Sequence, residues 1–438
     1  MLDVIIKNGN FVTSQGIIYG NMRIRDGIIQ EITENTIHHD AREIFDAKGY
    51  VVIPGLVDMH VHVDDPGRTE WEDWPHASRA ALSGGVTTIA DMPLNSTPAV
   101  TNVTNLKMKD KIAARTSCID YVLWGGLTNE NVDNIPGMQK EGVKAFKAFM
   151  SASGIPDFSS AGNESLLKGL SYTVGTDSFI GVHAECEDIA RYLSDELKSD
   201  GRMDTMAWVE SRPIFCETEA ISRFLSFIET TGGNGHICHV SSAEGVKMID
   251  QARKKGLPVT FETCASYLTF TQEDFVEKGS ILKCAPPLRT KENRELLWDY
   301  VKNGTIPIVT SDHSPCTREL KERGDNNIWE AWGGISGIQT TLYTMLTEGY
   351  HMRNLSLERL VEVCCENPAK RLGLGQRKGR LEVGYDADVV IIDLDSEWIF
   401  KEEDILTKNK LSPLIGKKMK GKIVKTFIGK DYEKGHFK

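Results

Sequence analysis

Histidines and an aspartate stand at the ends of several apolar runs, where they could bind a metal ion. His60 and His62 close the run VIPGLVDMHV, and because side chains two apart on a strand share a face, both imidazoles could reach one ion. His183, His239 and Asp312 close three later runs, each just before a loop. A hydrogen-bonded side chain at a strand end explains any one of these residues, but it does not explain the whole set. The set predicts a metal centre with histidine and carboxylate ligands.

The run GVKAFKAFM carries two lysines, and one of them could add a ligand of a different kind. A lysine ammonium would be repelled by metal ions, but a desolvated lysine loses its proton and becomes nucleophilic, so it can capture carbon dioxide. The resulting carbamate has two oxygen donors and suits the bridging of two ions. Alternation along a strand allows either Lys144 or Lys147 to face inward, and spacing alone does not choose between them. A solvated or salt-bridged lysine is the simpler interpretation of Lys144.

Apolar and β-branched runs, separated by stretches long enough for helices, could place these residues at one end of a barrel. The eight runs are VIPGLVDMHV, TTIADMP, YVLWGGL, GVKAFKAFM, FIGVHAE, HICHVSS, PVTFETCAS and PIVTSDHS. Helices are expected, for example, over residues 74–83, 242–255 and 292–303. Strand-then-helix units in this number predict an α/β fold, a (β/α)8 TIM barrel, in which catalytic groups lie at the carboxyl ends of the strands.

The two ends of the chain have a different pattern. Up to about residue 50, strand-like pieces such as DVIIKNG, NMRIRDG and IIQEIT alternate with Gly and Asn turns, which predicts small antiparallel β structure. The pattern returns after about residue 380, in RLEVGYDADVVIIDLD and GKKMKGKIVKTFIGK. The sequence thus indicates one large domain and one accessory domain.

Charge and composition argue against several classes of partner and location. Of 438 residues, 51 are Lys or Arg and 62 are Asp or Glu, and the net charge of −11 argues against nucleic acid or an anionic membrane as the main partner. There is no unbroken apolar stretch of about 18 residues and no start typical of a signal peptide, so we expect a cytoplasmic protein. Nine cysteines without a CxxC pair suit reduced core thiols, and the adjacent Cys364 and Cys365 are expected in a buried helix.

Several of these runs resemble motifs of a known enzyme family. PGLVDMHVH, FKAFM, VHAE, HVSS and TSDHSP together are similar to the amidohydrolase superfamily, in its cyclic amidase group of hydantoinases, dihydropyrimidinases, dihydroorotases and allantoinases. The resemblance covers nearly the whole chain. It implies a metal-dependent hydrolase barrel over residues 51–375 and a small β-sandwich domain formed by residues 1–50 and 376–438.

The resemblance also implies a site with two divalent metal ions. The residues carried over are, for one ion, His60, His62 and Asp312; for the other, His183 and His239; and, as a bridging N6-carboxylysine made with carbon dioxide, Lys147. Zinc is the ion that the resemblance favours, and cobalt, manganese or iron suit the same ligands. Such ions lower the pKa of water to around 7, and Asp312 would take the proton of the attacking hydroxide and pass it to the leaving nitrogen.

Two departures narrow the resemblance within the group. Dihydroorotases carry an arginine two residues after the second histidine, where this chain has Asp64, and hydantoinases and dihydropyrimidinases carry a tyrosine five residues after the bridging lysine, where it has Ala152. DPGRTEWEDW, GGVTTIADMPLNSTPA, VKAFKAFM and AWGGISGIQ are similar to the allantoinase branch. The resemblance thus implies a small-molecule substrate, allantoin, whose cyclic amide is hydrolysed to allantoate in purine catabolism.

Substrate contacts are predicted at further positions. They are Arg68, Asn95, Ser153, Cys284 and Gly334. Relatives hold the amide edge of the ring with backbone groups near the last two. The Asn and Ser side chains could add contacts, although a turn-forming Asn and a Ser that precedes a loop glycine are simpler interpretations. The arginine could contact the ureido tail or instead form a salt bridge to Glu70 or Glu72.

Two other functions fit the same fold. The first is a cyclic amidase of the hydantoinase or dihydropyrimidinase type with a broader substrate range. The second is a scaffold, because some dihydropyrimidinase-like proteins keep the barrel and lose metal ligands, but no ligand position is missing here. Relatives are often tetramers, so a homotetramer is expected, and AWGGISGIQTTLYTML could serve an interface or simply be a core helix.

Overall fold

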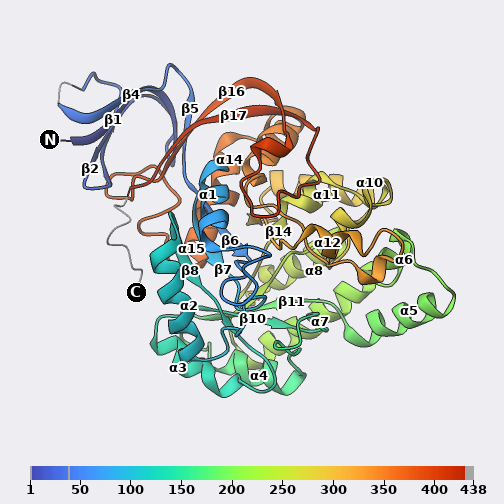
Figure 1. Cartoon of the computed structure of the whole chain (residues 1–438). Helices are drawn as coiled ribbons and strands as arrows, with labels where there is room; N and C mark the ends of the chain where they lie inside the picture. Colours follow the sequence, from blue (N-terminus) through green and yellow to red (C-terminus); the bar gives the residue numbers. More distant parts are fainter. Residues whose placement is uncertain (1, 38–39, 430–438) are drawn as a thin grey trace.

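The barrel strands follow one another in chain order, and each pairs in parallel with the next (Figure 1). The structure, a computed structural model, describes residues 2–37 and 40–429. The barrel strands are β6 (Leu56–Val61), β7 (Val86–Asp91), β8 (Asp120–Leu123), β9 (Gly125–Gly126), β10 (Ala145–Phe149), β11 (Phe179–His183), β12 (Gly235–Ile237), β13 (Val259–Phe261), β14 (Thr263–Cys264) and β15 (Val309–Thr310). β8 with β9, and β13 with β14, are halves of one strand, interrupted at Trp124 and Glu262. A parallel bridge between Val61 and His313 closes the ring, so the predicted (β/α)8 barrel is confirmed.

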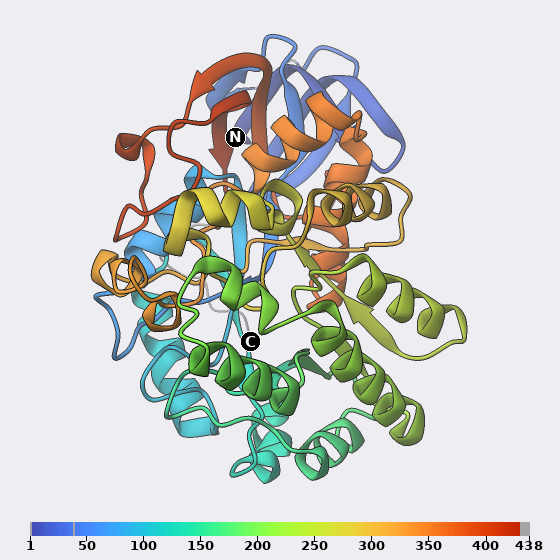
Figure 2. The same cartoon turned by 90° about the vertical axis from the view of Figure 1, so that its right-hand side faces the viewer.

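Helices connect the strands and cover the outside of the barrel (Figure 2). They are α1 (Trp74–Ser83), α2 (Val103–Thr116), α3 (Ile135–Lys140), α4 (Asn163–Ser171), α5 (Glu187–Ser199), α6 (Thr205–Glu210), α7 (Ile214–Thr231), α8 (Ala243–Lys254), α9 (Ala265–Thr269), α10 (Gln272–Lys278), α11 (Lys291–Lys302), α12 (Arg318–Glu322), α13 (Thr341–Thr344), α14 (Leu357–Val361) and α15 (Asn367–Arg371). The three expected helices are α1, α8 and α11, and Asp73, Ser242 and Thr290 cap their first turns by accepting a backbone N–H three residues later. Within the described residues, no helix combines the length and apolar character needed to cross a membrane.

Both ends of the chain contribute strands to one small β domain (Figure 1). The strands are β1 (Leu2–Thr13), β2 (Gly16–Arg25), β3 (Ile28–Thr33), β4 (Ala41–Asp46), β5 (Val51–Pro54), β16 (Val389–Ile399) and β17 (Lys418–Phe427). Their order is β17-β16-β5-β1-β2-β3, with β4 paired to β1. The expectation of antiparallel structure is only partly right, because β1 pairs in parallel with both β4 and β5. After β3, the strands β4 and β5 therefore both run in the same direction as β1. Residues 430–438 of the expected C-terminal segment lie outside the described residues.

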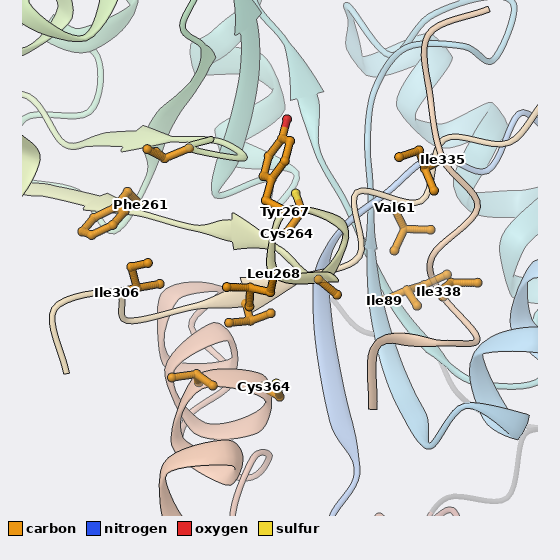
Figure 3. Close-up of a cluster of buried hydrophobic side chains, with 14 of the residues drawn as sticks. Val61, Ile89, Phe261, Cys264, Tyr267, Leu268, Ile306, Ile335, Ile338 and Cys364 are labelled. Atoms are coloured by element: carbon orange, nitrogen blue, oxygen red, sulfur yellow. The ribbon is translucent and has the colours of Figure 1, made fainter. Parts of the chain in front are cut away.

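Apolar side chains of the barrel strands and of the surrounding helices pack together in a buried core. Figure 3 shows part of this core, where Val61 and Ile89 from neighbouring strands lie near Ile338, and Leu268 lies above the turn that carries Cys364. Cys364 and Cys365 are buried in the helical turn Glu362–Glu366, which agrees with their interpretation as core residues. All residues of α13 are buried within the one chain, so a core role accounts for that helix.

A buried lysine joins the barrel to the C-terminal segment. Lys378 is 2% exposed, and its Nζ lies 2.6 Å from Asp120 of β8, 3.3 Å from Asp386 and 2.5 Å from Asp388. Burial by itself would lower the pKa of this lysine, but the surrounding carboxylates raise it above its ordinary value. The three carboxylates could in principle hold a cation, and here the ammonium group is that cation.

Candidate active site

A cavity of about 480 Å³ opens at the carboxyl ends of the barrel strands. The residues predicted as metal ligands all line it, and they are His60, His62, Lys147, His183, His239 and Asp312. They come from the ends of β6, β10, β11, β12 and β15 or from the residues that follow directly. The barrel thus brings together side chains that are up to about 250 residues apart in the chain.

Unusual backbone conformations aim several of these side chains. His239 has a backbone φ of 36°, Asp312 of 46° and Asn95 of 69°, values that residues other than glycine rarely adopt. Such conformations cost of the order of 1–3 kcal/mol each and cluster at functional sites. All three residues line the cavity. Their strain therefore supports the assignment of this cavity as the functional site.

The ligand atoms form two neighbouring groups. In the first, Asp312 Oδ1 lies 3.2 Å from His60 Nε2 and 3.8 Å from His62 Nε2. In the second, His183 Nδ1 lies 3.1 Å from His239 Nε2. Lys147 Nζ lies between the groups, 3.4 Å from His60 Nε2 and 3.5 Å from His239 Nε2.

These separations fit metal ligands. Zinc–nitrogen distances of about 2.0–2.1 Å in a tetrahedral site put two ligand nitrogens about 3.4 Å apart. The observed separation between His183 Nδ1 and His239 Nε2 is close to that value. The side chains of His60, His62 and Asp312 likewise offer ligand atoms within 4.8 Å of one another. A cluster of two imidazoles with a carboxylate and a neighbouring pair of imidazoles are together suited to hold two divalent ions.

Lys147 is the lysine that reaches the cavity. It is fully buried, and among the described residues no carboxylate oxygen lies within 4.0 Å of its Nζ. A buried ammonium surrounded by imidazoles lacks the anionic partner that such a charge requires. Lys144 differs, because its side chain is 38% exposed and its Nζ lies 3.7 Å from Asp177. The strand register therefore separates the two lysines that spacing left equivalent.

Electrostatics keep the imidazoles neutral. Burial first, and the charge of Lys147 second, hold the pKa values of His60, His62 and His239 well below their ordinary value. Burial also raises the pKa of Asp312 to about 8, although the lysine opposes this shift. Neutral imidazoles have the free electron pair that a metal ion needs, so the site is prepared to bind a cation.

Two buried glutamates contact the histidines, and neither was predicted from the sequence. Glu185 Oε2 lies 2.8 Å from His183 Nε2, on the side of the ring that faces away from His239. Glu262 contacts His60 Nδ1 in the same way. Glu185 belongs to the VHAE run, and Glu262 is a charged residue inside the apolar run PVTFETCAS, which was the only available signal.

Cations and aromatic rings form one wall of the cavity. Arg212 Cζ lies 3.7 Å and Lys283 Nζ 4.1 Å from the centroid of the Trp208 ring. Lys283 Nζ donates to the carbonyl oxygens of Trp329 and Ala331, at 3.3 and 2.6 Å. Burial, helped by neighbouring cations, lowers the pKa of Lys283 to about 7. This lysine thus holds a loop against the cavity.

A second buried lysine holds the next part of the same loop. Lys321 Nζ donates to the carbonyl oxygens of Trp332 and Gly334, at 2.9 and 2.6 Å. Burial lowers the pKa of Lys321 to about 8. The Gly334 N–H donates to the carbonyl of Lys283, so both backbone groups of this glycine already have protein partners. Gly334 lines the cavity, but its position there depends on these contacts.

The other predicted substrate contacts differ in how free they are. Asn95 lines the cavity and is 2% exposed, and its side-chain Nδ2 has no hydrogen-bond partner among the described residues. Ser153 also lines the cavity, but its hydroxyl donates to the carbonyl of Phe158. The carbonyl of Cys284 accepts the indole N–H of Trp208 at 2.8 Å. Asn95 is therefore the residue of the three with an unused donor.

Arg68 is not among the residues that line the cavity. Its guanidinium donates to the carbonyl of Asn95 at 2.6 Å and lies 3.4 Å from Asp157. The ion pair of Arg68 in the structure is thus with Asp157 and not with Glu70 or Glu72, and the carboxylate of Glu72 is buried near His313, at 3.5 Å. Arg68 instead supports the loop that carries Asn95.

The two positions at which the chain departs from relatives lie in different places. Ala152 lines the cavity, where a larger side chain would fill part of it. Asp64 is fully buried outside the cavity lining, and neither of its carboxylate oxygens has a hydrogen-bond partner among the described residues. Burial raises the pKa of Asp64 well above its ordinary value. Asp64 therefore offers no cationic group to a substrate.

Comparison with known proteins places these features in a family. A family model described as Amidohydrolase family matches residues 51–208 and 222–436. An allantoinase of Rubrobacter xylanophilus is 39% identical over 97% of this chain and 93% of its own length. One of Bacillus licheniformis is 38% identical, covering 97% and 94%. Among solved structures, the L-hydantoinase (dihydropyrimidinase) from Arthrobacter aurescens has a TM-score of 0.95 and 36% identity, covering 98% of this chain and 95% of its own. A D-hydantoinase has a TM-score of 0.90 and 30% identity, covering 98% and 94%.

Proposed function

The chain belongs to the amidohydrolase family, and from this membership we propose that it is a cyclic amidase that hydrolyses the ring of allantoin to allantoate. The observation that carries the proposal is likeness to allantoinases over nearly the full length of both chains. The chemistry of the cavity supports it, because a cluster of neutral imidazoles and a carboxylate suits metal-assisted hydrolysis. The cavity of about 480 Å³ is within the range that small-molecule sites occupy.

The proposed metal ligands divide between two divalent ions. They are His60, His62 and Asp312 for one ion, His183 and His239 for the other, and carboxylated Lys147 for both. Zinc suits these ligands, as do cobalt, manganese and iron. When bound, such ions supply a hydroxide nucleophile at neutral pH and polarise the carbonyl under attack. The position of Lys147 Nζ between the two groups supports its role as the shared ligand.

Asp312 is the proposed proton carrier. Its side chain is 19% exposed, whereas that of His60 is fully buried, so this carboxylate can reach a substrate in the cavity. It would accept the proton of the attacking water and deliver it to the ring nitrogen as the amide bond breaks. Asn95 is the proposed donor to the substrate, since its Nδ2 has no hydrogen-bond partner in the described part of the chain. The substrate ring would also contact three residues that line the cavity, Ser153, Cys284 and Gly334. Arg68 would act indirectly, by holding the loop of Asn95.

A hydantoinase of broader range is the second candidate function, favoured by the solved structures that the chain resembles. Ala152 and Asp64 argue for allantoin over dihydropyrimidines and dihydroorotate, whose carboxylate would find no cation at Asp64. The decisive experiment compares kcat/KM on allantoin, hydantoin, dihydrouracil and dihydroorotate with one metal-loaded preparation. We expect allantoin to be preferred by at least about tenfold. A higher value on hydantoin or dihydrouracil would support the alternative, and no turnover of any ring would support a scaffold.

The remaining features of the proposal concern the setting of the enzyme. Residues 51–375 would form the catalytic domain, with the β domain of the two terminal segments as its support. The protein would act in the cytoplasm as a homotetramer. Its net charge of −11 argues against nucleic acid or an anionic membrane as a partner. Sedimentation of the purified protein would test the tetramer directly.

A further inference from the structure

Three barrel strands supply no proposed metal ligand, and one of them carries a charged residue at the centre of the barrel. This residue is Glu262, at the interruption between β13 and β14. It is fully buried, and its two carboxylate oxygens face two histidines. One oxygen contacts His60 Nδ1, and the other lies 3.4 Å from His236 Nε2. A carboxylate without a cationic partner is costly in such a place, so its retention calls for an explanation.

The contact with His60 decides which nitrogen of that ring is available. A neutral imidazole has one N–H and one free electron pair, and an ionised carboxylate, the form assumed for Glu262, can only accept a hydrogen bond. The contact therefore places the N–H on Nδ1 and leaves the electron pair on Nε2. That nitrogen is the one that faces Asp312 Oδ1 at 3.2 Å and Lys147 Nζ at 3.4 Å.

A second carboxylate, that of Glu185, selects the opposite tautomer for a histidine of the second ligand group. Glu185 lies 2.8 Å from His183 Nε2, which leaves the electron pair on Nδ1, the nitrogen that faces His239 at 3.1 Å. The two histidines thus present different nitrogens, and in each case the carboxylate lies on the opposite edge of the ring. The position of the carboxylate accounts for the choice of nitrogen in both.

The other oxygen of Glu262 faces a second histidine. His236 Nδ1 lies 2.7 Å from the hydroxyl of Thr260, and burial holds the pKa of His236 well below its ordinary value, so the ring is neutral. His236 Nε2 lies 3.4 Å from the second oxygen of Glu262, but neither atom has a hydrogen-bond partner among the described residues. The carboxylate that contacts His60 is thus packed beside a second neutral imidazole, on β12.

We propose that Glu262 is a positioning residue that fixes the tautomer and orientation of His60 for one of the two metal ions. This inference rests on the proposed function, because it takes His60 as a metal ligand. Carboxylates that accept the second N–H of a ligand histidine commonly change metal affinity by about 10- to 100-fold when removed. The same range is expected here for the ion that His60 binds. The effect on the other ion should be smaller, since Glu262 reaches its ligand His239 only at the backbone N–H.

The test measures metal affinity without any substrate. Metal-free wild type, Glu262→Met and Glu262→Gln are titrated with Zn²⁺ against a chromophoric chelator, and folding is checked by circular dichroism. Glu262→Met should weaken one ion by about 10- to 100-fold and affect the other less. Glu262→Gln should recover part of the loss, because its amide oxygen can still accept the Nδ1 hydrogen. Glu217→Gln is the matched control, since Glu217 is also fully buried but bonds to Ser241 and Ser242 and should leave both ions unchanged.

A double mutant separates positioning from a general loss of packing. In a His60→Ala background, Glu262→Met should cost little further affinity, because the two residues act through one contact. Additive losses, or wild-type affinity for both ions in folded Glu262→Met, would overturn the inference. If Glu262→Met does not fold, unchanged affinity in Glu262→Gln overturns it and a several-fold loss at one ion supports it. A wild type that binds no metal at all would instead refute the proposed metal centre.

Discussion

Replacement of Lys147 by alanine tests the centre of the proposed site. Lys147 Nζ lies within 3.5 Å of nitrogens from both ligand groups, so a carbamate built on it would contact both ions. Its removal leaves each ion without one anionic ligand. Lys144→Ala is the matched control in the same segment, because Lys144 is 38% exposed and its charged partner is Asp177. The two lysines are three positions apart in sequence, and only Lys147 lines the cavity.

The size of the effect follows from the number of ions affected. Loss of a partner that only contacts a ligand costs about 10- to 100-fold in metal affinity. A ligand bound directly should cost at least the upper end of this range, or about 100-fold, for each ion. Because Lys147 serves both, the form with two ions should become about 10⁴-fold less stable, which corresponds to about 5.4 kcal/mol. Activity at limiting metal should fall by several orders of magnitude, and Lys144→Ala should stay within about twofold of wild type.

The assay combines metal content with rescue. Purified variants are dialysed against a fixed low concentration of Zn²⁺, bound metal is measured by mass spectrometry, and allantoin hydrolysis is followed. Acetate or propionate should restore part of the metal content and rate of Lys147→Ala, because a small carboxylate can enter the vacated space and supply two oxygens. Lys147→Ala with both ions and near-normal rates, or Lys144→Ala that loses both, would refute the reasoning and with it the inward face of β10.

Three further predictions concern metal, substrate and pH. Prolonged chelation should abolish turnover, and zinc, cobalt or manganese should restore it; a fully active preparation without transition metal would contradict the site. Asn95→Gly keeps the backbone conformation at φ 69° and removes only the side chain, so it should lower kcat/KM on allantoin by about tenfold through one lost hydrogen bond, while an unchanged value would remove Asn95 from the substrate contacts. Burial lowers the folded-state pKa of Lys283 to about 7, so above that pH the unfolded state binds more protons and stability rises up to the ordinary pKa near 10.4. In urea unfolding, the stability of wild type relative to Lys283→Met should therefore rise by about 2 kcal/mol between pH 7 and 9, and a flat difference would contradict this.

The barrel could be predicted because its strands are apolar runs of ordinary length. The interruptions at Trp124 and Glu262 could not, since they depend on how neighbouring strands pair and not on local residue type. The terminal strands looked like simple hairpins because turn residues separate them, and that pattern does not reveal the parallel pairing of β1 with β4 and β5. Parallel strands need a crossover connection between them, and no local residue pattern shows which strand such a connection leads to.

The site shows the same limit. His60, His62 and the other strand-end ligands could be expected from residue type and place, and the structure brings them into one cavity. Glu262 and His60 are 202 residues apart, and no spacing rule pairs them. The ion-pair partner of Arg68 could not be predicted for a similar reason, because Glu70 and Glu72 are close in sequence, whereas Asp157 comes from a distant loop. Residues at the ends of different strands come into contact only in the closed barrel, so these contacts could not be predicted from the sequence.

The central place of β5 in the terminal sheet has a consequence for how the chain is made. β5 pairs with β1 on one side, but its other edge waits for β16, which is synthesised more than 300 residues later. At about 5–20 residues per second, that edge is open on the ribosome for about 20 to 70 s. An open strand edge can pair with another chain, so polysomes that carry several nascent copies are where aggregation of this protein should begin. Slow translation ahead of β16 would lengthen the exposure, and a chaperone that covers β5 would relieve it.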